Sequence, residues 1–224
     1  PANVYGKPVP CQDEPKTQHF AALAKAVAAV KRHAPGKLAY INLYPSYAMI
    51  SASDKAQVGV ASYTEYLERF VQEVQPQLLS YDNYLVITSD DQQHAERIGG
   101  YYQDLVEVRR VAHKYQLPFW NIVCCNQLRK YTAIPTPANL ALQAYTTLAA
   151  GADGLTWFRH YADGYAYAPI DLEGDKTETW HYLQVVNRQV AVLGPLVNRL
   201  TSSGVFFTAP APADNLPLLP GRVV

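Results

Sequence analysis

The stretch Gln12-Asp13-Glu14-Pro15 follows the short segment Val9-Pro10-Cys11 and precedes a helical pattern that begins near Thr17. A strand that ends in a carboxylate and turns into a helix is typical of (β/α) barrels, whose strands open at their C-terminal ends into the active-site bowl. Glu14 is therefore the first candidate for a catalytic acid. A plain structural role is the alternative, because the helix dipole also stabilises an acid in the first turn.

The chain beyond this turn alternates helical and strand-like patterns. Apolar residues at helical spacing predict helices over residues 17–33, 63–74, 101–115, 137–150 and 177–200, the last of them bent near Gly194-Pro195. Apolar runs predict buried strands over residues 38–44, 78–84, 119–125 and 155–161, with a further short strand at 204–208.

Such alternation predicts a parallel sheet covered by helices. With the strand before Glu14 the sequence holds five strand–helix units, whereas a full barrel has eight. We therefore expect residues 1–208 to form strands four to eight of a (β/α)8 TIM barrel, followed by an irregular proline-rich tail over 209–224. An open α/β sheet is the alternative. Because a half-barrel would expose two edge strands, the sequence also predicts about 100 to 150 further residues before Pro1.

Composition excludes several classes of protein. The 224 residues are 49% hydrophobic with a formal charge of zero, so the chain can bury a core, and no basic run favours nucleic acid. No apolar stretch is long enough to cross a membrane, and the start at Pro1 resembles neither a signal peptide nor a natural initiator. We interpret Cys11, Cys124 and Cys125 as small buried residues, because the C-x-x-C spacing of metal sites is absent.

Aromatic and neutral polar residues near the strand ends suit a ligand with sugar rings. The chain has 17 tyrosines and three tryptophans, although such residues also pack ordinary cores. The candidate binding residues are Asp13, Asn42, Tyr44, Tyr81, Tyr84, Trp120, Asn121, Trp157 and His160. Asp171 and Glu173 are predicted to be solvated in a polar loop. The six histidines are scattered and do not predict a zinc site.

Several motifs together resemble one enzyme family. They are Asp13-Glu14-Pro15 and the segments 40–45, 79–84, 118–120, 143–145 and 151–154. Over roughly residues 10–208 the sequence resembles the C-terminal half of a clan A glycoside hydrolase, close to bacterial proteins related to β-galactosidases and cellulases. The resemblance implies a hydrolase of β-linked oligo- or polysaccharides with Glu14 as general acid/base. It also implies strands ending at Glu14, Tyr44, Tyr84, Cys125 and Tyr161, a carbohydrate as partner, no cofactor, and a secreted or periplasmic location.

One departure from the family is informative. Clan A enzymes carry a nucleophilic Glu at the end of strand seven, whereas residues 121–127 of this chain contain no acid. Asp82 is the best second carboxylate, with Asp13 more suited to orient a neighbour. If Asp82 and Glu14 lie roughly 6 to 10 Å apart, a water fits between them and the reaction inverts the anomeric centre. The alternative for Asp82 is a structural role, in which it bonds only to backbone amides. The alternative for the protein is a non-catalytic carbohydrate-binding barrel.

Overall fold

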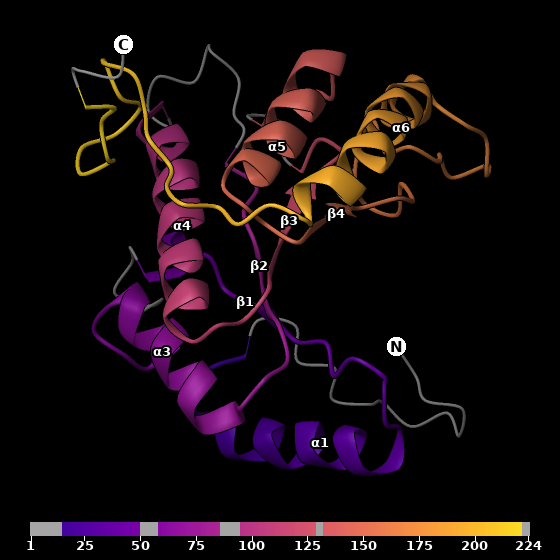
Figure 1. Cartoon of the computed structure of the whole chain (residues 1–224). Coiled ribbons are helices and arrows are strands. Elements are labelled where there is room, and N and C mark those ends of the chain that lie inside the picture. The colour runs from indigo at the N-terminus through magenta and orange to yellow at the C-terminus, as the bar shows by residue number, and fades with distance from the viewer. Residues whose placement is uncertain (1–14, 50–57, 86–94, 129–131, 221–224) are drawn as a thin grey trace. The chain divides into compact units, whose positions relative to one another are not determined.

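The computed structural model describes residues 15–49, 58–85, 95–128 and 132–220 (Figure 1). Cys11, Asp13 and Glu14 therefore lie outside the described residues, as does the strand predicted before them. The chain divides into two compact units, Pro1–Asp82 and Asn83–Val224.

Among its described residues, the N-terminal unit has two α-helices, two short 3-10 helices and one pair of parallel strands. Its elements are the 3-10 helix η1 (Thr17–His19), α1 (Phe20–His33), β1 (Asn42–Leu43), the 3-10 helix η2 (Ser46–Met49), α3 (Tyr63–Val74) and β2 (Leu79–Asp82). In the register of the pair, Asn42 lies beside Ser80 and Leu43 beside Tyr81. Both predicted helices are confirmed, because their start and stop signals are local in sequence.

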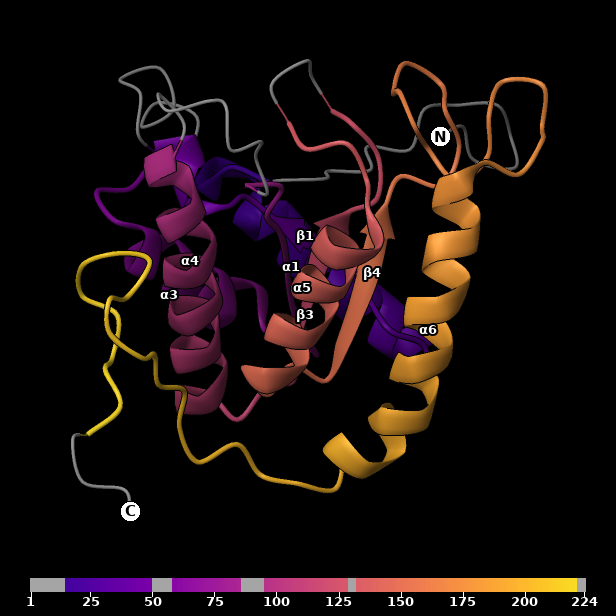
Figure 2. The same ribbon diagram turned by 90° about the horizontal axis from the view of Figure 1, so that it is seen from above.

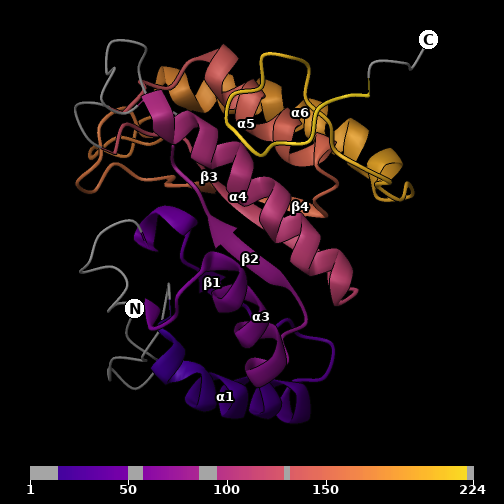
Figure 3. The same cartoon turned by 90° about the vertical axis from the view of Figure 1, so that its left-hand side faces the viewer.

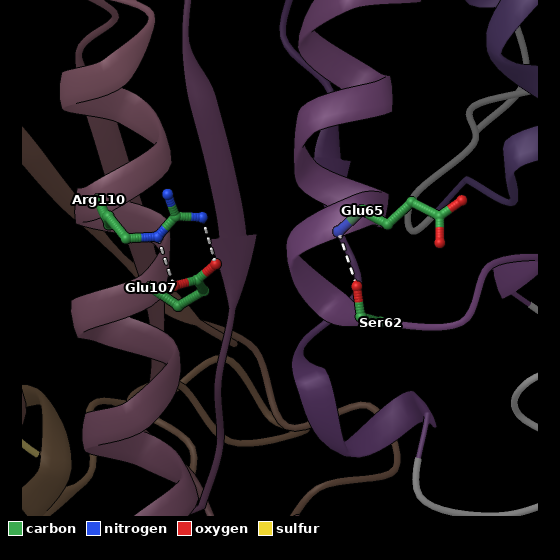
Figure 4. A network of polar contacts seen from close by, with 4 residues as sticks. All are labelled: Ser62, Glu65, Glu107 and Arg110. Carbon is green, nitrogen blue, oxygen red and sulfur yellow. Dashed lines mark hydrogen bonds and ion pairs between the residues drawn. The ribbon is translucent and has the colours of Figure 1, made fainter. Parts of the chain in front are cut away.

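The helices of this unit share an aromatic core. Phe20 of α1 packs edge-on against Phe70 of α3, with ring centroids 5.5 Å apart, and Figure 3 shows the two helices side by side. The N-terminus of α3 is capped by Ser62, whose Oγ accepts the N–H of Glu65 at 3.1 Å (Figure 4). The apolar stripe of α3 and its cap thus explain why residues 63–74 form a helix at this place.

The strands of this unit are shorter than predicted. The pattern at 38–44 yields only Asn42–Leu43, because Leu38 is 42% exposed and the N–H of Ala39 bonds the side chain of Gln77 instead of a strand partner. The run at 78–84 yields Leu79–Asp82, since the Oδ1 of Asn83 accepts the N–H of Leu85 and turns the chain there.

The C-terminal unit repeats the helix and strand alternation. Its elements are α4 (Ala95–Lys114), β3 (Phe119–Cys124), α5 (Pro137–Ala149), β4 (Gly154–Phe158) and α6 (Glu178–Val197). Strands β3 and β4 are parallel, with Trp120 beside Gly154 and Cys124 beside Phe158. Figure 2 shows α5 and α6 as neighbours, and Leu140, Ala144, Leu183 and Val186 from these helices form one buried cluster with Cys125.

The start of α4 differs from expectation, whereas the start of α5 agrees with it. Helix α4 begins at Ala95 rather than Tyr101. It contains Gly99-Gly100, a pair of glycines that is typical of a loop. A Cβ at position 99 would lie 2.6 Å from the Cβ of Ala213, so the glycine permits the C-terminal tail to pack closely on the helix. Helix α5 starts as predicted, with a capping box between Thr136 and Asn139 and a proline at its first turn.

Two further segments correct the strand predictions. Strand β4 stops at Phe158 rather than 161, because the carbonyl of Arg159 bonds the side chains of Asn126 and Cys125 instead of a strand. Residues 204–208 form no strand but a single bridge between Phe207 and Leu218. The described chain is thus a mixed α/β protein with parallel strand pairs and covering helices. None of its described helices is long and apolar enough to cross a membrane.

Candidate functional site

Asp82 is a buried carboxylate at the end of β2. Its residue is only 3% exposed, and its Oδ1 accepts a hydrogen bond from the Nδ2 of Asn42 on β1, 3.2 Å away. A buried charge is costly unless it is hydrogen-bonded, so the Asn42 amide compensates part of the lost hydration. The sequence prediction placed both residues near strand ends, and the structure brings them into contact.

A chain of hydroxyl donors continues from this pair toward solvent. The Oγ of Ser80 donates to the Oδ1 of Asn42 at 3.3 Å, and the hydroxyl of Tyr40 lies 2.8 Å from the same Oγ. Since the single proton of Ser80 goes to Asn42, Tyr40 is the donor to Ser80. The bonds therefore run in one direction, from Tyr40 through Ser80 and Asn42 to the carboxylate of Asp82. Such a chain polarises each of its members.

Alternation along the strands separates this polar row from an apolar face. Residues two apart on a strand share a face, so Ser80 and Asp82 lie on one side of β2 while Leu79 and Tyr81 lie on the other. Tyr81 is fully buried, as is its neighbour Leu43 on β1. The side chain of Tyr81, a predicted sugar-binding residue, therefore presents no exposed surface to a ligand.

Tyr44 and Pro15 meet at one buried hydroxyl. Tyr66 of α3 donates its hydroxyl to the carbonyl of Pro15 at 2.6 Å, and the same oxygen accepts the N–H of Tyr44 at 3.4 Å. Tyr44, just past β1, is itself half-buried, with its ring centroid 6.5 Å from that of Tyr66. Pro15 directly follows Glu14, the predicted acid. The sequence prediction did not select Tyr66, which reads as one more apolar position of a helix.

The end of β3 carries two neighbouring thiols, those of Cys124 and Cys125. Burial raises the pKa of Cys124 to about 12 and also raises that of Cys125. Both thiols are therefore protonated near neutral pH and are poor nucleophiles, since the thiolate is the reactive form. The prediction that they are small buried residues is confirmed.

Gln143 of α5 holds this strand end in place. Its Oε1 accepts the N–H of Cys124 at 2.9 Å and its Nε2 donates to the carbonyl of the same residue at 3.0 Å. Gln143 is buried and replaces the strand partner that the backbone of Cys124 would otherwise need. The signal for it in sequence was a glutamine at an inward position of an apolar helix face.

Aromatic side chains gather just beyond β4. The ring of Tyr84 stacks on Phe158 with centroids 5.1 Å apart, and Tyr165 meets Phe158 edge-on at 5.2 Å. The guanidinium of Arg159 lies 5.6 Å from the centre of the Tyr165 ring and pairs with Asp163 at 2.9 Å. We call Tyr84, Phe158 and Tyr165 the aromatic group. Of its members only Tyr84 was selected from sequence.

His160 lies beside a different aromatic residue. Its exposed ring packs edge-on against Trp180 of α6 at 5.3 Å, and the ammonium of Lys176 lies 4.6 Å from the centre of the same indole. In the loop between them, the Oδ1 of Asp171 accepts the N–H of Asp175 at 2.7 Å and Glu173 is exposed, in line with the predicted polar loop.

The remaining candidates contact other residues of the C-terminal unit. Trp157 packs against the buried cluster of α5 and α6 and donates its Nε1–H to Asn187 at 2.8 Å. Asn121 is fully buried and donates to Thr147 at 3.0 Å. Trp120 lies near the beginning of β3, not its end, and its indole covers Gly154, where a Cβ would approach Nε1 to 2.8 Å. In the described residues, no group of three or more His, Cys, Asp or Glu is arranged to hold a metal ion.

Comparison with known proteins gives one structural likeness. No protein-family profile and no curated protein sequence matches the chain. Among solved structures, the β-galactosidase of the psychrophilic Marinomonas ef1 is similar, with a TM-score of 0.58 at 14% sequence identity. The likeness covers 84% of this chain and 30% of the β-galactosidase chain. In its fold, the chain is thus similar to part of a β-galactosidase.

Proposed function

We propose that this chain is the C-terminal part of a (β/α)8 glycoside hydrolase that acts on a β-linked oligo- or polysaccharide. The observation that carries the proposal is the buried Asp82 at the carboxyl end of β2, held by a one-way chain of donors. Its support comes from the fold, which is similar to part of a β-galactosidase, and from the Asp13-Glu14-Pro15 motif. In this proposal Glu14 is the general acid and Asp82 the second carboxylate.

The donor chain suits Asp82 to the role of base. Hydrogen bonds donated to a carboxylate favour its ionised form, and Asn42 donates directly to Asp82. In an inverting reaction, the base removes a proton from the attacking water while the acid protonates the leaving oxygen. The new bond forms between the water oxygen and the anomeric carbon as the glycosidic bond breaks. Glu14 and Asp82 thus exchange their protonation states over one cycle and are reset by solvent.

Sugar binding is assigned to three partly exposed aromatic side chains. Tyr84, Tyr165 and Trp180 are partly exposed and offer ring faces on which a sugar can stack. Tyr81, Asn121 and Trp157 are left out of the proposed binding surface, because their side chains are buried or packed against helices.

Hydrolysis of p-nitrophenyl β-glycosides and β-linked oligosaccharides by the protein tests the proposal. Glu14→Gln and Asp82→Asn should each abolish turnover while oligosaccharide binding remains. Glu107→Gln is the matched control, since Glu107 pairs with Arg110 on the surface of α4 at 2.8 Å (Figure 4). Full activity of Glu14→Gln would remove that residue from the mechanism.

A non-catalytic carbohydrate-binding protein is the second candidate. It is favoured by the end of β3, where residues 119–128 contain no acid and the buried thiol of Cys124 stays protonated. This candidate predicts binding of an oligosaccharide without any hydrolysis by the natural protein, which calorimetry and product analysis on the same sample distinguish from an enzyme.

A further inference from the structure

The hydroxyl of Tyr66 joins two backbone segments that are far apart in sequence. It donates to the carbonyl of Pro15 at 2.6 Å and accepts the N–H of Tyr44 at 3.4 Å. Both bonds lie within the N-terminal unit. One of the joined residues directly follows Glu14, and the other directly follows β1.

The ring that carries this hydroxyl is held on several sides. Tyr66 is fully buried, its centroid lies 5.7 Å from that of Phe20, and Tyr63 stacks on it at 6.3 Å. A tyrosine has only two side-chain torsions, and close packing leaves neither free to rotate. The position of the oxygen is therefore set by the core between α1 and α3.

Pro15 is well suited to be anchored in this way. A proline has no backbone N–H, so the carbonyl is the one polar backbone group through which position 15 can be tied. Pro15 is buried, and its carbonyl would be left without this bond if the Tyr66 hydroxyl were removed. One peptide bond separates that anchored residue from Glu14, a Cα–Cα distance of about 3.8 Å when the bond is trans.

We propose that Tyr66 is a positioning residue, which ties Pro15, the residue that follows Glu14 in the sequence, to the segment just after β1. The expected effect on catalysis rests on the proposed function. The tie between Pro15 and Tyr44 rests on the two hydrogen bonds alone. A phenylalanine would fill the same space in the core, so packing alone does not require the hydroxyl. A displacement of about 1 Å in a catalytic group costs about 100-fold in rate.

The test compares Tyr66→Phe with Tyr63→Phe, which removes a hydroxyl from the same helix and from a ring stacked on that of Tyr66. Steady-state rates on p-nitrophenyl β-galactoside, or on the best substrate of the screen, are measured together with hydrogen exchange of the Tyr44 amide. We expect Tyr66→Phe to lower kcat about 10- to 100-fold with KM within about twofold of the parent. The Tyr44 amide should exchange faster in this variant only.

The two arms keep this inference separate from the proposed function. If Glu14→Gln abolishes turnover while Tyr66→Phe keeps the parent kcat, the inference is overturned and the function stands. The inference is also overturned if Tyr63→Phe lowers kcat as much, because that result would indicate general loosening of the core. If the parent hydrolyses nothing, the proposed function fails. Unchanged exchange of the Tyr44 amide in Tyr66→Phe then overturns the anchor as well, whereas faster exchange supports it.

Discussion

The side-chain amide of Asn42 donates to the carboxylate of Asp82 across the parallel pair β1 and β2, at 3.2 Å and almost out of contact with solvent. The two residues do not face each other in the strand register, where Asn42 lies beside Ser80. The bond is therefore diagonal and needs both strands in register.

A double-mutant cycle of Asn42→Ala and Asp82→Ala should reveal strong coupling. The single change at Asn42 takes a donor from a buried carboxylate, and we expect it to lower the free energy of unfolding by about 1 to 3 kcal/mol. In the double variant the carboxylate is gone too, so the effects should fail to add by about 0.5 to 3 kcal/mol in urea denaturation. Simple additivity would show that the bond contributes nothing.

Gln143→Leu should destabilise the C-terminal unit. The replacement has a similar volume but leaves the N–H and the carbonyl of Cys124 without their side-chain partner. Each lost hydrogen bond should lower the free energy of unfolding by up to about 3 kcal/mol. Gln103→Leu serves as the control, because Gln103 bonds the carbonyl of Asp214 at an exposed site. Equal denaturation midpoints for the two variants would show that the hydrogen bonds of Gln143 to Cys124 do not stabilise the unit.

The buried thiol of Cys124 should make stability fall at high pH. Its pKa is raised from 9.0 to about 12 by burial, so the folded state keeps a proton that the unfolded state releases. The stabilisation is complete below the unfolded pKa and is lost as pH rises toward 12, by about 1.4 kcal/mol for each unit above about 9. Melting temperatures between pH 8 and 10.5 measure this loss. Cys124→Ala should show a shallower decline, and an identical decline would refute the assignment.

Tyr165→Ala should weaken oligosaccharide binding about tenfold, which corresponds to about 1.4 kcal/mol of lost stacking. The residue is partly exposed and meets Phe158 edge-on, so its removal takes one ring face from the aromatic group. Isothermal titration with the best ligand of the screen measures the effect. Tyr115→Ala, which changes a tyrosine just past α4, should bind as the parent does. A parent affinity in Tyr165→Ala would remove this loop from the binding surface.

Strand boundaries and the surroundings of strand side chains depend on residues far apart in the sequence. Helix α3 was predicted to the residue, yet β1 proved to be two residues long, because Leu38 and Tyr40 are exposed and Ala39 bonds a side chain. Trp157 had the sequence character of a ligand platform but packs against α5 and α6. In both cases the local sequence correctly indicates apolar residues. The length of the strand and the contacts of its side chains depend on partners elsewhere in the chain.

The sequence by itself determined the alternation of helices and strands, the start of α5, and the choice of Asp82 as a candidate. These follow from residues within a few positions of one another, where capping, helix periodicity and turn residues act locally. Only the tertiary structure decided that Tyr40, Ser80 and Asn42 form a donor chain to Asp82, and that Tyr66 ties Pro15 to Tyr44. Buried polar groups must find partners, and in these contacts the partners lie 22 to 51 residues away, beyond the reach of any local pattern.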